Sequence, residues 1–550
     1  MLYACGMNLK HLNRRDFLRS SALGSLASIM DVQAIGQIYP FALGVASGSP
    51  THDSVVLWTR IQGANQTLIA EAQVSVRWEM AHDEAFKQLV QKGKTTADAL
   101  LGHSVHVEVQ NLLPDRWYFY RFMVGNAISP VGRTRTFAKA GSTVNHLRLA
   151  YASCQRWEAG YFSAYKHMLA DQPDVVLFLG DYIYEYPGNP VSTMVRKPSS
   201  TSTFGFVLTL DDYRARYAQY KTDPDLQTMH AACPWLMTWD DHEVQNDYAG
   251  LIGGDSGAAD VFSNPKDFVL RRGAAYQAYY ENMPIRASTL MQGLANLRAL
   301  NTGAEMRIYQ RVDVGQLASL YMLDTRQYRD RQACSKDGKY GASLVNPEQC
   351  PNWLDPKRTL LGARQEAWLE AQFVKAKQRG QTWNVMAQST LFGLRDNKPG
   401  VGQSFFNDGW DGYPQARTKL TDALQKHAVA NPVMLGGDVH ENWVGHIKAD
   451  YAQTPAAQNS KPIGVEFCGT SITSPAGSSA IARTAERLAE NPHFVYADAT
   501  QRGYGLMEFT PQQLITNLRV VDDVRQPNSQ VSTSAKFVVQ AGKSLIERAG

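Results

Sequence analysis

"DVVLFLGDYIYEY", residues 174–186, joins an apolar run to a short polar segment. The uninterrupted apolar residues before Gly180 are typical of a strand buried on both faces, as strands of parallel sheets are. An acidic and a phenolic side chain, Asp181 and Tyr184, follow the glycine closely. Burial of a carboxylate costs free energy unless the carboxylate is paired. Either these side chains bind a ligand at the end of the strand, or they only occupy a strand-to-loop turn.

Four other apolar runs also end in ionisable side chains. They are "HLRLAYASCQ" with Cys154, "PWLMTWDDHE" with Asp240, Asp241 and His242, "ASLYMLDTRQY" with Asp324 and Arg326, and "NPVMLGGDVHEN" with Asp438 and His440. Helical stretches such as residues 356–380 separate the runs, which predicts an α/β architecture. Function in open α/β sheets collects at the carboxyl ends of strands, so we expect these side chains to meet at one site.

Carboxylates, an imidazole, a phenol and a thiol are together the ligand types of a metal centre, and oxygen-rich ligation favours hard cations. Without a cation, neighbouring carboxylates repel one another and bind protons. Asp181 lies where one carboxylate could bridge two metals, and Tyr184 could bind a trivalent ion as phenolate. The alternatives are that Tyr184 is a packed aromatic residue and that Cys154 is a small buried one.

Residues 38–140 have a different pattern, in which apolar residues occupy every second position. Segments such as "VSVRWEM" and "VHVEVQNL" predict antiparallel strands. The length of about 100 residues and the segment "NLLPDRWYFYRFMVGN" resemble a fibronectin-like or immunoglobulin-like sandwich. The small and polar residues 138–144 indicate a linker, and no catalytic cluster precedes it.

Residues 1 to about 35 resemble a twin-arginine export leader. Paired Arg14 and Arg15 precede Phe17, Leu18 and a weakly apolar segment, and "VQA" at 32–34 resembles a cleavage site. This predicts export by the twin-arginine translocase and a periplasmic or secreted mature protein. The alternative is an amphipathic N-terminal helix.

The composition argues against several classes of protein. The chain has 550 residues, of which 44% are hydrophobic and 10% aromatic, enough for two or more domains. Lys and Arg total 55 against 51 Asp and Glu, and no long run of one sign indicates a nucleic-acid or polybasic membrane surface. No apolar run reaches the roughly 18–20 residues that span a bilayer. No G-x-S-x-G motif indicates a covalent serine hydrolase.

The cysteines divide into three groups. Cys334 and Cys350 flank a polar, glycine-containing loop, and they either form a disulfide or are two free thiols. Cys233 and Cys468 have apolar neighbours, which predicts packed side chains. Cys5 would leave with the leader.

The motifs "GDYIY", "WDDHE" and "GGDVH", in this order after the "ASC" strand, resemble the signature of calcineurin-like metallophosphoesterases, and most closely that of the alkaline phosphatase D (PhoD-like) family. Segments at 270–284, 322–334, 383–390, 408–420 and 502–510 also resemble this family. The resemblance covers nearly the whole chain. It implies an α/β metallophosphoesterase core of sheets layered with helices over residues 145–525, with residues 526–550 as its C-terminal extension, after the all-β domain.

The resemblance implies a ferric ion and calcium in place of the iron–zinc pair of the wider superfamily. The implied iron ligands are Cys154, Asp181, Tyr184 and His440. The carboxylate of Asp181 would also bridge the iron to the calcium.

For calcium, the resemblance implies oxygen ligands. Asp438 stands where the superfamily has the first histidine of its His-x-His motif, and a carboxylate suits calcium better than zinc. Asp241 stands where the superfamily has a metal-binding asparagine, and Asn246 follows a few residues later. Which of Asp240, Asp241 and Asn246 bind stays open.

Three further assignments concern side chains near the metals. His242 would protonate the leaving group, or else only orient another group. Asp324 and Arg326 are expected to form a structural ion pair in preference to binding metal. Arg271 or Arg272 could bind phosphate bidentately, or could lie on a solvated helix face.

Together the residues and the resemblance predict a secreted, metal-dependent phosphoesterase, alkaline phosphatase D-like, that hydrolyses phosphate mono- or diesters by attack of a metal-bound hydroxide. A phospholipase or phosphodiesterase on the same metal site is the alternative. We expect small phosphoester substrates, with phospholipid as the alternative, and a monomer. A different class, a surface-binding protein whose α/β part binds metal only structurally, predicts no loss of function when His242 is removed.

Overall fold

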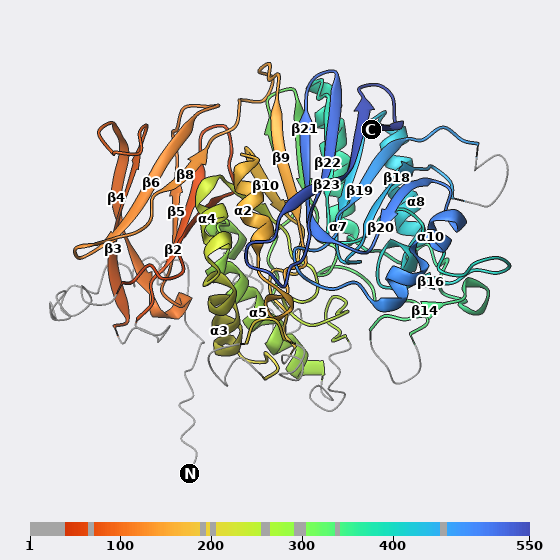
Figure 1. Cartoon of the computed structure of the whole chain (residues 1–550), viewed down its shortest axis with the longest axis horizontal. Helices are drawn as coiled ribbons and strands as arrows, with labels where there is room; N and C mark the ends of the chain where they lie inside the picture. The colour runs from red at the N-terminus through yellow and green to blue at the C-terminus, as the bar shows by residue number, and fades with distance from the viewer. Residues whose placement is uncertain are drawn as a thin grey trace, which may run out of the picture.

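The computed structural model describes residues 39–63, 71–186, 194–197, 205–254, 265–290, 304–335, 341–451 and 459–549. The predicted export leader lies outside these residues. Two large sheets pack face to face in the centre of the molecule, and helices cover the outer face of each (Figure 1). The sequence-based expectation of a layered α/β core after an all-β domain is confirmed.

The first sheet has ten strands in the order β24-β23-β22-β21-β9-β10-β11-β1-β2-β5. The strands of this sheet that belong to the α/β domain are β9 (Leu147–Ala152), β10 (Val175–Phe178), β11 (Trp235–Met237), β21 (Arg502–Phe509), β22 (Gln513–Val521), β23 (Val531–Gln540) and β24 (Ile546–Ala549). The central strands β9, β10 and β11 are parallel, and β21 to β24 continue the sheet as antiparallel strands. The expected C-terminal extension therefore forms one edge of this sheet.

The second sheet has seven strands in the order β12-β13-β15-β17-β19-β18-β20. They are β12 (Gln310–Val314), β13 (Ala318–Met322), β15 (Trp383–Ala387), β17 (Pro432–Gly436), β18 (Asn442–Ile447), β19 (Gly464–Cys468) and β20 (Phe494–Asp498). Strands β13, β15, β17 and β19 are parallel. Their carboxyl ends therefore share one edge of the sheet. A separate short ladder pairs β14 (Leu344–Val345) with β16 (Phe405–Phe406).

Strand β10 is buried on both faces, as its continuous apolar run predicts. Val175 and Leu177 of β10 belong to the core between the two sheets, whereas Val176 and Phe178 belong to the core beneath the helices. All four side chains are 0% exposed. Burial of an apolar side chain of this size contributes about 1.5–3 kcal/mol, which explains the lack of polar residues before Gly180.

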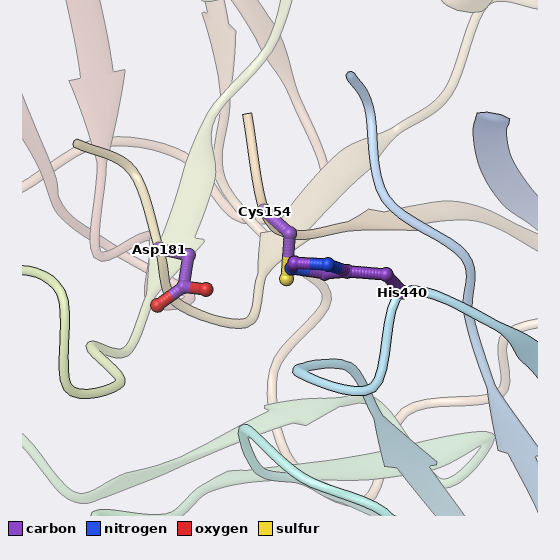
Figure 2. A group of neighbouring side chains, drawn as sticks. All are labelled: Cys154, Asp181 and His440. Atoms are coloured by element: carbon purple, nitrogen blue, oxygen red, sulfur yellow. The ribbon is translucent and has the colours of Figure 1, made fainter. Parts of the chain in front are cut away.

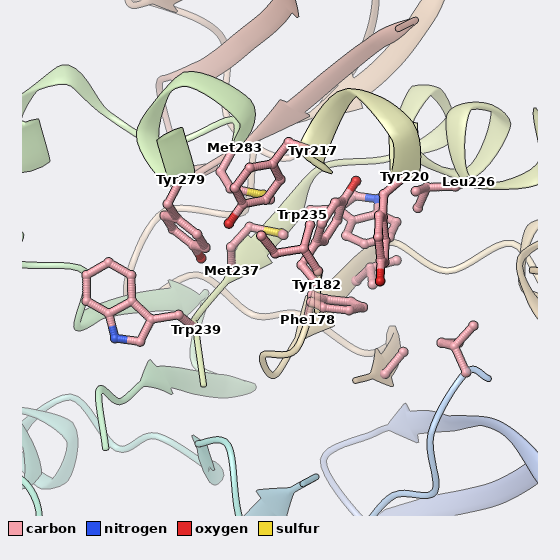
Figure 3. Packing of buried hydrophobic residues seen from close by; sticks show 14 of the residues in the cluster. Phe178, Tyr182, Tyr217, Tyr220, Leu226, Trp235, Met237, Trp239, Tyr279 and Met283 are labelled. Carbon is pink, nitrogen blue, oxygen red and sulfur yellow. The ribbon is translucent and has the colours of Figure 1, made fainter. Parts of the chain in front are cut away.

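Four helices cover the outer face of the first sheet, namely α2 (Ser163–Ala170), α3 (Leu210–Lys221), α4 (Pro224–Ala232) and α5 (Pro265–Asn282). Aromatic side chains dominate this layer, among them Tyr217 and Tyr279 from the helices and Phe178 and Trp235 from the strands (Figure 3). On the second sheet the corresponding helices are α7 (Ala363–Gln378) and α8 (Pro414–Lys426), while α10 (Ser478–Glu490) lies beside β20. Short 3₁₀ helices occupy Ala99–Leu101, Trp157–Ala159, Pro347–Gln349 and Trp410–Gly412.

The N-terminal β domain is a sandwich around its own apolar core. One layer contains β1 (Val45–Gly48), β2 (Val55–Arg60) and β5 (Ser104–Val109), and the other contains β3 (Gln73–Ala81), β4 (Leu89–Asp98), β6 (Trp117–Val124), β7 (Ala127–Ile128) and β8 (Gly132–Arg135). The first layer is not separate from the core, because β1 pairs in parallel with β11 at Gly48 and Trp235. A Cβ atom on Gly48 would lie 2.4 Å from the carbonyl oxygen of Pro284, so only glycine permits this approach. No pattern in the sequence predicted that the two domains share a sheet.

Cys334 and Cys350 form the disulfide that was one of two expectations, with their Cα atoms 5.7 Å apart. Cys233 and Cys468 are buried and free, as expected. Among the residues that the structure describes, no helix is both long and apolar enough to cross a membrane.

Candidate metal centre

The predicted ligands follow directly after parallel strands of the two sheets. Cys154 follows β9, Asp181 follows β10, and Asp438 and His440 follow β17. All four residues have a left-handed backbone, with φ of 59°, 57°, 65° and 55° in that order. Few residues other than glycine adopt this conformation, and such backbone is concentrated at functional sites. The chain thus turns sharply at each strand end and directs these side chains away from the hydrophobic cores.

Cys154, Asp181 and His440 come together at the junction of the two sheets (Figure 2). Their candidate ligand atoms all lie within 4.8 Å of one another. Tyr184 completes this group, since its hydroxyl donates to Asp181 Oδ2 at 2.9 Å and lies 3.1 Å from His440 Nε2. The four implied iron ligands, from three separate strand ends, therefore surround one point.

A second group of candidate ligands shares Asp181 with the first. It consists of Asp181, Asp241 and His242, again with ligand atoms within 4.8 Å of one another. A third group joins Asp241 to Asp247 and Asp408. Asp181 thus belongs to the first and second groups, and Asp241 belongs to the second and third.

Several carboxylate oxygens in these groups lack a hydrogen-bond partner in the described part of the chain. They are Asp181 Oδ1, Asp240 Oδ2 and Asp241 Oδ1, and all three are buried. Burial raises the pKa of Asp181 well above its usual range; His242 opposes this rise, and Asp241 adds to it. Buried oxygens without partners are costly. Cations would satisfy these oxygens and keep the carboxylates ionised, so the donor set fits a metal centre.

The softer donors fit a strongly Lewis-acidic ion. Burial, followed by the charge of Asp181, raises the pKa of both Cys154 and Tyr184 well above the usual range. Without a cation both side chains would stay protonated. Burial lowers the pKa of His440 to about 4, which keeps the imidazole neutral and able to bind metal.

His242 is held in place by a carboxylate. Its Nδ1 lies 2.6 Å from Glu185 Oε2, and its ring centre lies 4.1 Å from that of Tyr184. Burial alone would lower the pKa of His242, but Glu185 and then Asp181 raise it well above its usual range. Glu185 Oε1 accepts from the backbone nitrogen of Asn246 at 2.7 Å. The side-chain amide of Asn246 makes no hydrogen bond within the described ranges, so its oxygen is available as a ligand.

Glu243 organises two strand ends at once. Its carboxylate accepts from the backbone nitrogens of Asp181 at 3.1 Å, Tyr182 at 2.6 Å and Asp240 at 2.9 Å. Glu185 and Glu243 stand inside the motifs "DYIYEY" and "WDDHE", yet neither was predicted to take part in the site. Their position close to the acidic residues at the strand ends was the available signal.

Asp438, by contrast, was predicted as a ligand, and its Oδ2 accepts a hydrogen bond from Thr390 Oγ1 at 3.1 Å.

The expected ion pair between Asp324 and Arg326 is wrong. The Arg326 guanidinium donates from Nε to Asp240 Oδ1 at 2.5 Å and from one terminal nitrogen to Asp408 Oδ2 at 2.6 Å. Asp324 Oδ1 instead accepts from Trp239 Nε1 at 3.0 Å. Arg326 neutralises a cluster of acids that the sequence alone did not show to be neighbours.

Of the two alternatives for Arg271 and Arg272, the solvated helix face is wrong, because both side chains are buried. Arg272 donates to the carbonyl oxygens of Gly250 at 2.6 Å and Ala304 at 2.9 Å, so it supports the backbone and does not serve as a phosphate clamp. Arg271 donates to the hydroxyl of Tyr213 at 2.9 Å.

A groove of about 370 Å³ lies beside the metal centre. Its lining includes Arg156, Pro475 and Arg502, together with apolar residues such as Met194 and Ile481. The groove adjoins the first ligand group, because the carbonyl oxygen of Pro475 lies 2.9 Å from His440 Nδ1.

Two family models match the chain. The model described as PhoD-like phosphatase matches residues 149–518, and that of the PhoD-like phosphatase N-terminal domain matches residues 27–138. Alkaline phosphatase D of Bacillus subtilis (strain 168) is 42% identical over 515 residues, which are 93% of this chain and 82% of that protein. A solved structure of PhoD superposes with a TM-score of 0.83 at 40% identity and covers 93% of this chain and 92% of its own.

Proposed function

The chain belongs to the PhoD-like phosphatase family and is a phosphoric ester hydrolase, and from this premise we propose that it cleaves phosphate esters with the help of cations held at the strand ends. The observation that carries the proposal is the position of Asp181. Its carboxylate belongs to two ligand groups, and its buried Oδ1 has no hydrogen-bond partner in the described part of the chain.

The ligands divide by chemistry. Thiol, phenol, imidazole and carboxylate donors would hold a ferric ion, and these are Cys154, Tyr184, His440 and Asp181. Oxygen donors would hold calcium; besides the shared Asp181 they are Asp241, Asn246 and Asp438. When bound, such cations neutralise the charge of phosphate oxygens and lower the pKa of water.

His242 is the candidate general acid. Glu185 occupies its Nδ1 at 2.6 Å, which fixes the orientation of the ring and leaves Nε2 for a proton transfer. A protonated Nε2 would donate its proton to the oxygen of the departing alcohol. Glu185 acts through His242, as a positioning residue.

The choice of substrate tests this role. His242→Ala should lower turnover of an alkyl phosphate by roughly 100- to 10,000-fold, because the alkoxide needs a proton to leave. Turnover of p-nitrophenyl phosphate should fall much less, since nitrophenolate leaves without one. His146→Ala is the control, because His146 also lies beside a carboxylate, Glu508 at 3.7 Å, but outside the centre. Equal losses for both substrates would contradict the assignment, and no loss at all would favour a structural metal site.

Metal removal tests the cations themselves. Protein purified without added metal should contain iron and calcium by elemental analysis. Chelation by EGTA should abolish phosphoester hydrolysis reversibly, because Asp241 and Asp438 are hard oxygen donors. Full activity in calcium-free, zinc-supplemented buffer would rule out the calcium assignment.

A phosphodiesterase or phospholipase activity is the second candidate, and the groove beside the centre favours it. The groove could hold the second organic group of a diester, which a monoester lacks. Comparison of kcat/KM for a monoester, a diester and a phospholipid measures the preference.

We also propose that residues 1 to about 35 direct export to the periplasm or beyond. The paired Arg14 and Arg15 support this proposal. A reporter fused after this segment should be exported, and Arg14→Lys with Arg15→Lys should retain it in the cytoplasm. Unchanged export of the double variant would contradict a twin-arginine route.

A further inference from the structure

Arg156 lies at the boundary between the metal centre and the groove. It follows Cys154 by two positions and lines the groove. Its guanidinium carbon lies 5.9 Å from the ring centre of Tyr184, and its side chain is 18% exposed. The cation is therefore close to the candidate metal ligands but open to a solute in the groove.

The backbone of Arg156 is fixed to the metal centre. Its nitrogen donates to Ser474 Oγ at 3.2 Å, and its carbonyl oxygen accepts from Thr473 Oγ1 at 2.7 Å. Ser474 Oγ in turn donates to the hydroxyl oxygen of Tyr184 at 2.7 Å. One serine thus joins the base of Arg156 to a candidate iron ligand. Such rigid attachment is what a binding residue needs to hold its position.

Within the part of the chain that the structure describes, the guanidinium of Arg156 makes no hydrogen bond to the protein. Its ion pair with Glu158, Nε to Oε2 at 4.0 Å, is too long for a hydrogen bond, and its terminal nitrogens make none within the described ranges. The other arginines of the groove differ. Arg502 donates to backbone carbonyl oxygens, His440 among them at 2.7 Å, and Arg525 binds Asp523.

We propose that Arg156 binds a non-bridging oxygen of the phosphoester, while the groove holds the organic group beyond the phosphate; this inference rests on the proposed function. A guanidinium fork matches two phosphate oxygens and keeps its charge at any working pH. The apolar wall of the groove, with Met194, Pro475 and Ile481, suits an organic group next to that anion.

Glu158 limits the strength of this contact. It is 4% exposed, and its Oε1 is buried without a hydrogen-bond partner among the described residues. Its nearest oxygen lies 4.0 Å from Arg156 Nε, so its charge opposes an anion beside the guanidinium. Removal of this charge should strengthen phosphate binding, which gives a test in the opposite direction.

The experiment measures binding of inorganic phosphate to the metal-loaded enzyme by calorimetry, and KM and kcat for a diester. Arg156→Gln should weaken phosphate binding and raise KM by roughly 10- to 100-fold, the range of one or two charge-assisted hydrogen bonds. The kcat should change far less than KM, because the substituted residue holds substrate and transfers no proton. Arg156→Lys should recover part of the loss, and Glu158→Gln should tighten phosphate binding severalfold.

The control is Arg133→Gln in strand β8 of the β domain, where the guanidinium carbon lies 3.6 Å from the ring centre of Trp117. It should leave binding and kinetics unchanged. Wild-type phosphate affinity and KM in Arg156→Gln would overturn the role of Arg156 even while the enzyme hydrolyses phosphoesters. A wild-type enzyme without any phosphoesterase activity would overturn the proposed function instead. If Arg156→Gln does not fold, an unchanged phosphate affinity of Glu158→Gln would overturn the inference.

Discussion

Among the described residues, the hydroxyl of Tyr184 has three polar neighbours. Asp181, His440 and Ser474 all lie within 3.1 Å of it, although a phenol carries only one proton to donate. The hydroxyl can donate to only one of these neighbours, two of which are themselves candidate metal ligands. A cation bound at this point could replace the proton, and Tyr184 would then bind it as a phenolate. Burial otherwise raises its pKa well above the usual range, so ionisation requires a strongly Lewis-acidic ion.

Tyr184→Phe tests this directly, since it removes only the oxygen. The metal-loaded wild type should be coloured, with a visible ligand-to-iron band, and the variant should lose or shift the band and turn over about tenfold more slowly or worse. Tyr182→Phe is the matched control, because Tyr182 is also a buried tyrosine but belongs to the core beneath the helices. Its hydroxyl lies 2.8 Å from His230 Nε2. An unchanged band and full activity in Tyr184→Phe, with iron still bound, would show that Tyr184 is only a packed aromatic residue.

At the scale of single residues, position in the chain indicated candidates but not their partners. Asp181 and His440 were predictable, because each follows an apolar strand within a few residues. The contacts of Arg326 with Asp240 and Asp408 were not, because they depend on which strands of two sheets meet. Ser474 gave no signal at all, since serines are common in loops and its role comes only from its contact with Tyr184.

Among the elements, the loop closed by the disulfide supports the third group of candidate ligands, which contains Asp241 and Asp247. Within the span closed by Cys334 and Cys350, the backbone nitrogen of Ala342 donates to Asp247 Oδ2 at 2.9 Å. The backbone nitrogen of Asp247 donates to Asp241 Oδ2 at 2.7 Å. The loop is thus two hydrogen bonds away from a candidate calcium ligand.

The double variant Cys334→Ser and Cys350→Ser should lose about 3 kcal/mol of stability, the usual effect of opening a loop of this length. Its melting temperature should fall by a few degrees, and its calcium affinity should fall while its iron content stays the same. The control is the wild type with and without a reductant, since the reductant should reproduce the loss and should not affect the double variant. Identical melting curves for the two proteins would contradict this role of the loop.

Among the secondary-structure elements, the sequence was sufficient to predict the parallel strands. It was not sufficient to predict that the β domain and the α/β domain share a sheet. Continuous apolar runs such as that of β10 predict burial on both faces wherever they occur. The pairing of β1 with β11 rests on one register position, Gly48 with Trp235, and a lone glycine has many possible explanations in a sequence.

Across the whole molecule, the β domain and the core meet around a buried cation. Lys221 of α3 places its ammonium 4.2 Å from the ring centre of Trp58 in the β domain and 5.2 Å from that of Tyr182 in the core. Burial, followed by the charge of Arg60, lowers the pKa of Lys221 to about 7. We therefore expect the stability of the folded protein to depend on the protonation of this lysine.

The sign of the pH dependence follows from the two pKa values. In the unfolded chain Lys221 keeps its proton up to its ordinary pKa of 10.5, whereas the folded protein releases it near pH 7. Between these values the unfolded state binds more protons, so stability rises with pH, by at most roughly 1.4 kcal/mol per pH unit. Lys221→Met should be more stable than wild type below pH 7, and the difference should shrink as the pH rises toward 10. Parallel melting temperatures of both proteins across this range would contradict the argument.

The strand that presents Cys154 has an open edge for most of the time in which the chain is made. β9 pairs with β10 on one side, but its other partner is β21, where Gly505 lies opposite Tyr151. Strand pairs so far apart in sequence form slowly and only after both strands exist. β9 therefore gains its second neighbour only after almost the entire polypeptide has been made, and a cation held by Cys154 would meet a complete site only at that late stage of folding.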